Sequence, residues 1–172
     1  MAGDEASLYL QATLQVVWHQ RGRTPIIKRH PGRESSHFYG GLNLHTGHEV
    51  AMRSEIMNAE TSALFLQKIL QAYPTVPLIL LWDRAPWHYG SQIKAVLEAN
   101  PRLQIIYLPT AAPDLNPQEH VWKATRKEVS HNHSCKKLKQ LADDFETHLT
   151  SSSFPCSFLH KYDYPRLCMM FK

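Results

Sequence analysis

Two apolar runs separated by a helix-length segment constrain the fold of this chain more than any other feature. Leu78 to Trp82 and Leu103 to Leu108 lack polar alternation, which predicts two strands buried on both faces. Between them, Tyr89 to Ala99 has the apolar spacing of a helix, and Asn100-Pro101 ends it. A helix that joins two such strands implies a right-handed parallel crossover, so the sequence predicts an α/β sheet.

The preceding residues add antiparallel strands to this sheet. Phe38 to Leu44 and His48 to Arg53 are predicted strands, joined at the turn His45-Thr46-Gly47. Asn58 is placed to cap a helix that Pro74 stops. The other predicted elements are a short β-compatible stretch from Leu14 to Trp18 and helices from Asn116 to about His131 and from Lys137 to Leu149. Together these elements predict a mixed sheet covered by helices.

Composition excludes several classes of protein. The 172 residues suit one globular domain, and the longest apolar run, Val76 to Trp82, is too short to span a bilayer. The N-terminus lacks the basic flank and apolar stretch of a signal peptide. The three cysteines, Cys135, Cys156 and Cys168, form no Cys-x-x-Cys motif, which indicates reduced thiols in a cytoplasmic protein. A net charge of +4 permits a polyanionic partner without requiring one.

Three acidic positions are candidates for chemistry, and each has a plain structural alternative. Asp83 follows the first buried strand, where ligands bind in open α/β sheets, but an aspartate before Ala85-Pro86 is also an ordinary turn residue. Glu119 stands three residues after Asn116, the spacing of a capping box, so it could serve the helix alone. The pair Asp4-Glu5 taken alone is a solvated terminus. Spacing does not decide between these interpretations.

The combination of motifs is more specific than any single one. The acid pair at residues 4–5 is followed by Trp18 with Arg21-Gly22-Arg23-Thr24-Pro25, by Asp83-Arg84-Ala85-Pro86-Trp87-His88, and by the loop Leu108-Pro109 to Pro113-Asp114-Leu115-Asn116-Pro117-Gln118-Glu119-His120-Val121-Trp122. Over residues 4 to about 149 this resembles the catalytic domain of bacterial insertion-sequence transposases related to mariner elements, which are DDE superfamily endonucleases. The 35 residues between Asp83 and Glu119 fit that family's spacing.

The resemblance implies a ribonuclease-H-like fold and a metal-dependent reaction on DNA. Asp4, Asp83 and Glu119 are then expected to hold two divalent cations, Mg²⁺ or Mn²⁺, with Asp83 bridging them. The implied activity is nicking at an element end, followed by attack of the freed 3′-hydroxyl on target DNA. The implied partners are element-end and target DNA and a second copy on that DNA, in a bacterial cytoplasm and at the nucleoid when DNA is bound.

Basic residues follow Glu119 closely and are candidates for contacting DNA phosphates: Lys123, Arg126, Lys127, Lys136, Lys137 and Lys139. A solvated helix face is the alternative interpretation. Trp87 and Trp122 are predicted to be core aromatics rather than stacking platforms. His88, His120, His131 and His133 show no zinc spacing and are predicted to be structural or exposed.

The chain also departs from the family pattern. In these transposases an apolar strand and a helix-turn-helix domain precede the first aspartate, whereas Asp4 follows only Met1-Ala2-Gly3. We therefore expect a largely truncated first strand and a truncated or split gene product that an upstream helix-turn-helix polypeptide complements. Arg84 stands where the family commonly has asparagine.

The expected organisation is a catalytic domain over residues 1–150 and an unpatterned tail over 151–172. Two other functions stay open. One is an inactive transposase remnant that only binds DNA or a partner, which the truncated strand favours. The other is a ribonuclease-H-fold nuclease outside transposition, which the Pro-Asp-Leu-Asn-Pro loop argues against.

Overall fold

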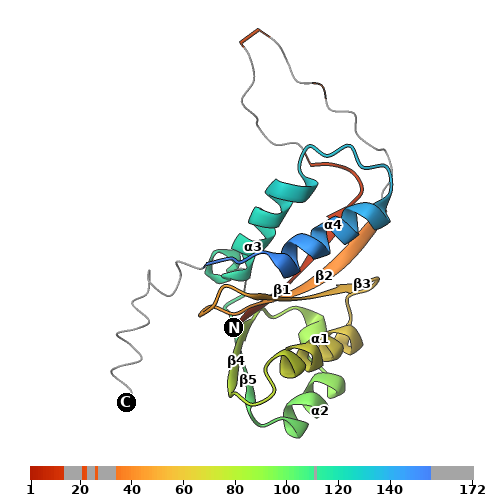
Figure 1. The fold of residues 1–172 in the computed structure, drawn as a ribbon. Coiled ribbons are helices and arrows are strands. Elements are labelled where there is room, and N and C mark those ends of the chain that lie inside the picture. The colour runs from red at the N-terminus through yellow and green to blue at the C-terminus, as the bar shows by residue number, and fades with distance from the viewer. Residues whose placement is uncertain (14–20, 23–25, 27–33, 111, 156–172) are drawn as a thin grey trace.

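Figure 1 shows the fold as a computed structural model, which describes residues 1–13, 21–22, 26, 34–110 and 112–155. Several predictions fall outside these residues and are not tested. They concern the stretch from Leu14 to Trp18, Cys156, Cys168 and the tail beyond Pro155. Cys135 is a free thiol, as predicted.

The molecule is built on one mixed sheet. Its strands are β1 (Ala2–Tyr9), β2 (Ser35–Leu42), β3 (Glu49–Ser54), β4 (Leu78–Trp82) and β5 (Leu103–Tyr107), in the order β3-β2-β1-β4-β5. β1, β2 and β3 pair antiparallel, and β4 and β5 continue the sheet parallel to β1. The predicted β2–β3 hairpin and the parallel β4–β5 pair are thereby confirmed.

The first strand is complete enough to form the centre of the sheet. β1 has eight residues, and it pairs with β2 along its whole length, from Ala2 opposite Leu42 to Tyr9 opposite Ser35. The expectation that this strand is largely truncated is therefore wrong. That expectation assumed an apolar strand before Asp4, whereas the buried residues Ala6 and Leu8 follow the acid. Asp4 lies within the strand rather than after it.

Helices cover both faces of the sheet (Figure 1). α1 (Ala59–Ala72) and α2 (Ser91–Ala99) lie on one face, and α3 (Gln118–Thr125) and α4 (Leu138–Ser151) lie on the other. The predicted helices are confirmed, and Asn58 caps α1 by accepting the Thr61 N–H at 2.8 Å. A five-residue π-helical turn, Arg126–Ser130, continues α3. Short 3₁₀ turns at Pro86–His88 and Pro113–Leu115 follow the ends of β4 and β5.

Two apolar cores result, one on each side of the sheet. Phe38, Trp122 and Phe145 centre the core under α3 and α4, and Phe65 and Trp82 centre the core under α1 and α2. The Trp122 side chain is buried in the first core, as predicted.

The prediction that β4 and β5 are buried on both faces is wrong. Ile79 and Ile106 are each 51% exposed, because α1 and α2 cover only one face of these two strands. Apolar residues alone do not reveal which faces of a sheet its helices cover. None of the helices among the described residues has the length and apolar character needed to cross a bilayer.

Candidate active site

The three predicted acids meet in one pocket. Asp4 comes from β1, Asp83 follows β4, and Glu119 lies in the first turn of α3; all three line a cavity of about 260 Å³. The other residues described in its wall are Arg84, Ala85, Leu108, Pro109, Thr110, Ala112, Pro113 and Asn116. The pocket therefore opens beyond the carboxyl end of β4, where open α/β sheets bind ligands.

Asp4 is held against α3. Its Oδ2 accepts a hydrogen bond of 3.0 Å from the indole N–H of Trp122. Burial, assisted by the nearby charges of Glu5 and Glu119, raises the pKa of Asp4 to about 7, although the Trp122 hydrogen bond works in the opposite direction. The Asp4 carboxylate therefore lies in a site where a positive charge would be stabilising.

A glycine lets α3 approach Asp4 closely. Gly40 on β2 stands opposite Asp4, and a Cβ atom there would lie 2.6 Å from the Trp122 ring and closer still to the Gln118 amide nitrogen. A side chain at residue 40 would therefore displace the Trp122 ring and the neighbouring Gln118 and Glu49 side chains. The absence of a side chain thus leaves room for Trp122 to reach Asp4.

Asp83 is oriented by hydrogen bonds to one of its oxygens. Oδ1 accepts from the Nδ1–H of His88 at 2.8 Å and from the Ala85 N–H at 3.1 Å. The His88 hydrogen bond is the main reason that the pKa of Asp83 lies below its usual value. The side chain is 47% exposed, so this fixed carboxylate is also open to a ligand.

Glu119 is not part of a capping box. Asn116 caps the helix, because its Oδ1 accepts the Gln118 N–H at 3.1 Å. The box would need the Asn116 N–H to reach the Glu119 carboxylate, but that N–H donates to the Pro113 carbonyl instead. The structural alternative for Glu119 is therefore wrong, and Glu119 lines the pocket.

The second acid of β1 lies on the other face of the sheet. The Glu5 side chain is only 5% exposed and accepts hydrogen bonds from the indoles of Trp82 and Trp87 and from the Nε2–H of His88. The interpretation of Asp4-Glu5 as a solvated terminus is therefore wrong. Sequence reasoning missed Glu5 and His88 as neighbours of the site, because 83 residues separate them in the chain.

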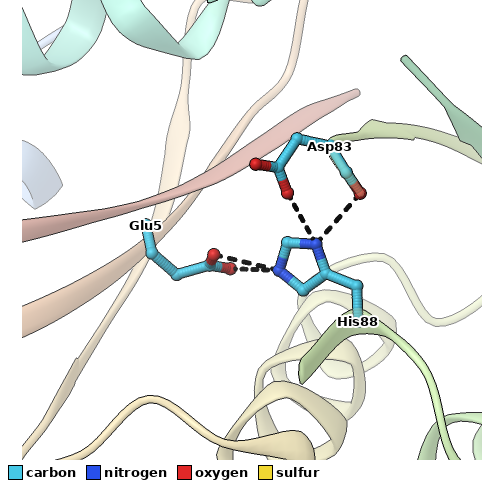
Figure 2. A group of neighbouring side chains, drawn as sticks. All are labelled: Glu5, Asp83 and His88. Atoms are coloured by element: carbon cyan, nitrogen blue, oxygen red, sulfur yellow. Dashed lines mark hydrogen bonds and ion pairs between the residues drawn. The ribbon is translucent and has the colours of Figure 1, made fainter. Parts of the chain in front are cut away.

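The imidazole of His88 is fully buried between two carboxylates (Figure 2). Burial alone would lower the pKa of His88, but the hydrogen bonds to Asp83 and Glu5 raise it to about 9. Both ring nitrogens face carboxylate oxygens, so both carry a proton. Of the two outcomes predicted for His88, structural or exposed, exposure is therefore excluded.

The donor set of the pocket fits a hard divalent cation. Asp4, Asp83 and Glu119 offer carboxylate oxygens, the ligand type that Mg²⁺ and Mn²⁺ prefer. The repulsion between Asp4 and Glu119 is the kind that a bound cation relieves. No histidine or cysteine is among the described residues that line this pocket, which does not suit zinc.

The six predicted DNA-contacting residues come from the part of the chain that follows Glu119. They are on α3, on the π-helical turn, in the segment before α4 and in the first turn of α4, and all are exposed except the half-buried Arg126. None of them lines the acid pocket. Their placement fits either a solvated face or a surface for phosphates.

Comparison with known protein sequences identifies the family to which this chain is similar. Residues 1–142 match the sequence family described as DDE superfamily endonuclease. Over 157 residues the chain is 27% identical to an insertion element IS630 uncharacterized 39 kDa protein of Shigella sonnei, covering 88% of this chain and 45% of that protein.

Solved structures share the fold at low identity. The Mos1 strand transfer complex superposes with a TM-score of 0.69 at 16% identity, covering 93% of this chain and 50% of that one. The Mos1 transposase catalytic domain with raltegravir and Mn gives 0.61 at 13% identity, covering 88% and 70%. The chain thus spans about half the length of the curated relative and of the Mos1 chain in the strand transfer complex. The mixed sheet with helices on both faces is ribonuclease-H-like, and the chain belongs to the DDE superfamily endonucleases.

Proposed function

We propose that this chain is a transposase catalytic domain that cleaves and joins DNA strands with the help of divalent cations. The observation that carries the proposal is the convergence of Asp4, Asp83 and Glu119 on one pocket from β1, β4 and α3. These residues lie far apart in the sequence, and no local turn or cap accounts for Glu119. Family membership makes phosphoryl transfer on DNA the expected chemistry.

Asp4, Asp83 and Glu119 would hold two ions, Mg²⁺ or Mn²⁺. Such a pair supplies activation of a water or 3′-hydroxyl and stabilisation of the leaving oxygen in an in-line displacement. The protein contributes orientation: Trp122 fixes the Asp4 carboxylate, and His88 and the Ala85 N–H fix that of Asp83. Preorganised ligands do not have to reorganise during the reaction.

The exposed lysines that follow Glu119 would contact the DNA backbone. Lys123 lies one turn beyond Glu119 on α3, and Lys127 follows on the π-helical turn. Phosphate contacts of this kind give affinity and position without reading sequence.

The solved relatives support DNA as the substrate. They include Mos1 transposase in a paired-end complex with a transposon end and in a strand transfer complex. By analogy, we propose that this chain acts on element ends and target DNA, as a dimer on the DNA, in a bacterial cytoplasm. Residues 1–150 would form the catalytic domain. Because the chain spans half of these relatives, the proposal concerns the domain rather than a whole transposase.

The test is a nicking assay with an end-labelled duplex. The wild-type chain should nick DNA in Mg²⁺ or Mn²⁺ and lose this activity in EDTA. If the chain binds the duplex but cuts it in neither metal, the inactive DNA-binding remnant is the better description. Equal cleavage with and without EDTA would exclude a metal-dependent site.

A further inference from the structure

One buried histidine lies next to the proposed metal ligands without lining their pocket. The His88 ring has no exposed surface, and its centroid stacks 3.6 Å from that of Trp82 with an interplanar angle of 23°. A ring enclosed in this way cannot touch a substrate phosphate or exchange protons with the solvent in the pocket. Any role in the reaction must therefore pass through the residues that it contacts.

Its two nitrogens contact two different acids. Nδ1 donates to Asp83 Oδ1 at 2.8 Å and to the Asp83 carbonyl at 3.1 Å, whereas Nε2 lies 2.9 Å from both oxygens of Glu5 (Figure 2). Glu5 is fixed in turn by the indoles of Trp82 and Trp87, at 3.3 and 3.0 Å. A continuous set of hydrogen bonds thus runs from the centre of β1 to the end of β4.

We propose that His88 is a positioning residue: anchored by Glu5, it holds the Asp83 carboxylate in the orientation that binds a divalent cation. This inference rests on the proposed function, since it takes Asp83 to be a metal ligand. His88 holds one oxygen of Asp83, and Figure 2 shows the other oxygen directed away from the imidazole. Residues that fix a ligand in this way commonly control metal affinity.

A metal ion bound directly by Glu5, Asp83 and His88 is the rival interpretation. One ligand atom from each residue lies within 4.8 Å of the other two. However, the imidazole occupies the space between the acids, and each of its nitrogens already donates a hydrogen bond to one of them. An ion there would have to break both interactions, so the geometry favours His88 as a bridge.

Two substitutions separate the two ends of this bridge. The amide nitrogen of asparagine can replace Nδ1, and that of glutamine can replace Nε2. His88→Asn therefore keeps a donor for Asp83, whereas His88→Gln keeps a donor only for Glu5. A matched control is His148→Gln, which alters a histidine that contacts Thr125 away from the pocket.

The measurement is Mn²⁺ binding to the purified chain, by calorimetry or electron paramagnetic resonance, beside urea unfolding of each variant. We expect His88→Gln to weaken Mn²⁺ binding about 10- to 100-fold. His88→Asn and His148→Gln should stay close to wild type. A purely structural role would instead make both His88 variants less stable while leaving Mn²⁺ affinity in the folded protein unchanged.

The outcomes distinguish this inference from the proposed function. Wild-type affinity in folded His88→Gln, or equal weakening in both His88 variants, overturns the role of Nδ1. A wild-type chain that binds no Mn²⁺ overturns the metal site itself.

A second readout needs neither metal nor a stable His88 variant. In ¹⁵N-histidine-labelled protein, both ring N–H protons of His88 should be protected from exchange, and Asp83→Asn should shift the Nδ1–H resonance most. Rapid exchange of the Nδ1 proton in the wild type contradicts the bridge.

Discussion

The side-chain amide of Asn116 donates a hydrogen bond of 3.1 Å to the carbonyl of Gly3. The two residues precede Glu119 and Asp4, so this hydrogen bond ties the start of α3 to β1 beside both acids. Asn116 is 6% exposed, and its Oδ1 also caps α3. One side chain thus stabilises the helix and sets its distance from the central strand.

Replacing Asn116 by alanine should therefore affect both stability and activity. Removing a helix cap and a buried hydrogen bond costs about 1–3 kcal/mol of unfolding free energy, measurable by urea denaturation. Mn²⁺ binding should weaken as well, because Glu119 is then no longer tied to β1. Asn58→Ala is the control, since Asn58 caps α1 away from the pocket. Asn58→Ala should lower the unfolding free energy but leave Mn²⁺ affinity unchanged. Equally weakened Mn²⁺ binding in both variants would contradict a specific role for the hydrogen bond between Asn116 and Gly3.

Asp83→Asn should reduce metal-dependent cleavage to background while the fold is retained. The amide oxygen can still accept from Ala85 and keeps the shape of the side chain, but it lacks the charge that holds a cation. Cleavage of the labelled duplex and the unfolding midpoint would be measured on the same preparation. If the variant nicks DNA at the wild-type rate, Asp83 is not in the catalytic centre.

Glu119→Gln separates a ligand from a helix-stabilising residue. Since the capping box is not formed, the substitution should change the midpoint of thermal unfolding little, yet cleavage should fall to background. Cleavage by Glu119→Gln would be compared with cleavage by Asp83→Asn in the same assay, since both variants are expected to fall to background. Unchanged activity and unchanged stability together would leave Glu119 with no role in the pocket.

A buried glutamate makes stability depend on pH. Burial raises the pKa of Glu49 to about 8, even though Gln118 and the Gly41 backbone donate hydrogen bonds to its carboxyl. Its Oε2 is buried and has no partner among the residues that the structure describes. The folded chain keeps this proton at pH values where the unfolded chain, with a pKa near 4.5, has released it. Stability should therefore fall as the pH rises from about 4.5 to about 8.

Glu49→Gln tests this dependence, because it removes the ionisation and keeps the acceptor for Gln118. The variant should match the wild type near pH 4.5 and exceed it by about 1–3 kcal/mol near pH 8 in urea unfolding. Asp4 and His88 also have raised pKa values, but the wild type and the Glu49→Gln variant both contain these two residues. The difference in unfolding free energy between the two proteins therefore reports on Glu49. A difference that does not change with pH contradicts the assignment.

Substituting Lys136, Lys137 and Lys139 together by glutamine should weaken DNA binding equally for element-end and random duplexes. These exposed side chains can neutralise phosphates, but contacts with phosphates do not distinguish one base sequence from another. The slope of log affinity against log salt should also become less steep, by about 0.9 for each phosphate that the variant no longer neutralises. A titration of both duplexes at several salt concentrations measures this. An unchanged slope would assign the three lysines to a solvated face.

Much of the fold can be predicted from local patterns. Apolar periodicity and turn residues locate the β2–β3 hairpin, β4, β5 and the four helices. They miss β1 because it reads Ala-Gly-Asp-Glu-Ala-Ser-Leu-Tyr, with small and charged residues where a buried strand is expected to be apolar. Pairing with β2 and β4 on either side stabilises this strand, and no local pattern records that.

The candidate site can be predicted only in part, because only some of its residues stand in recognisable local sequences. Asp83 and Glu119 stand in distinctive local sequences, next to a strand end and a proline-rich loop. The contacts of Glu5 with His88 and of Asn116 with Gly3 join residues 83 and 113 positions apart. Such pairs arise from tertiary packing, which a single sequence does not reveal.

The alternation of side chains along β1 makes strand register a determinant of chemistry. Asp4 and Glu5 are consecutive, so they point to opposite faces, one toward Trp122 and the other toward His88. A slip of one residue against β2 would turn each of them to the opposite face of the sheet. In the slip that carries Glu5 into the position of Asp4, a longer acid lies in the pocket, and Ala6 takes the position of Glu5, so that Nε2 of His88 loses its carboxylate partner. A single-residue insertion that shifts this pairing should therefore abolish the proposed metal-dependent cleavage while every acidic residue remains in the sequence.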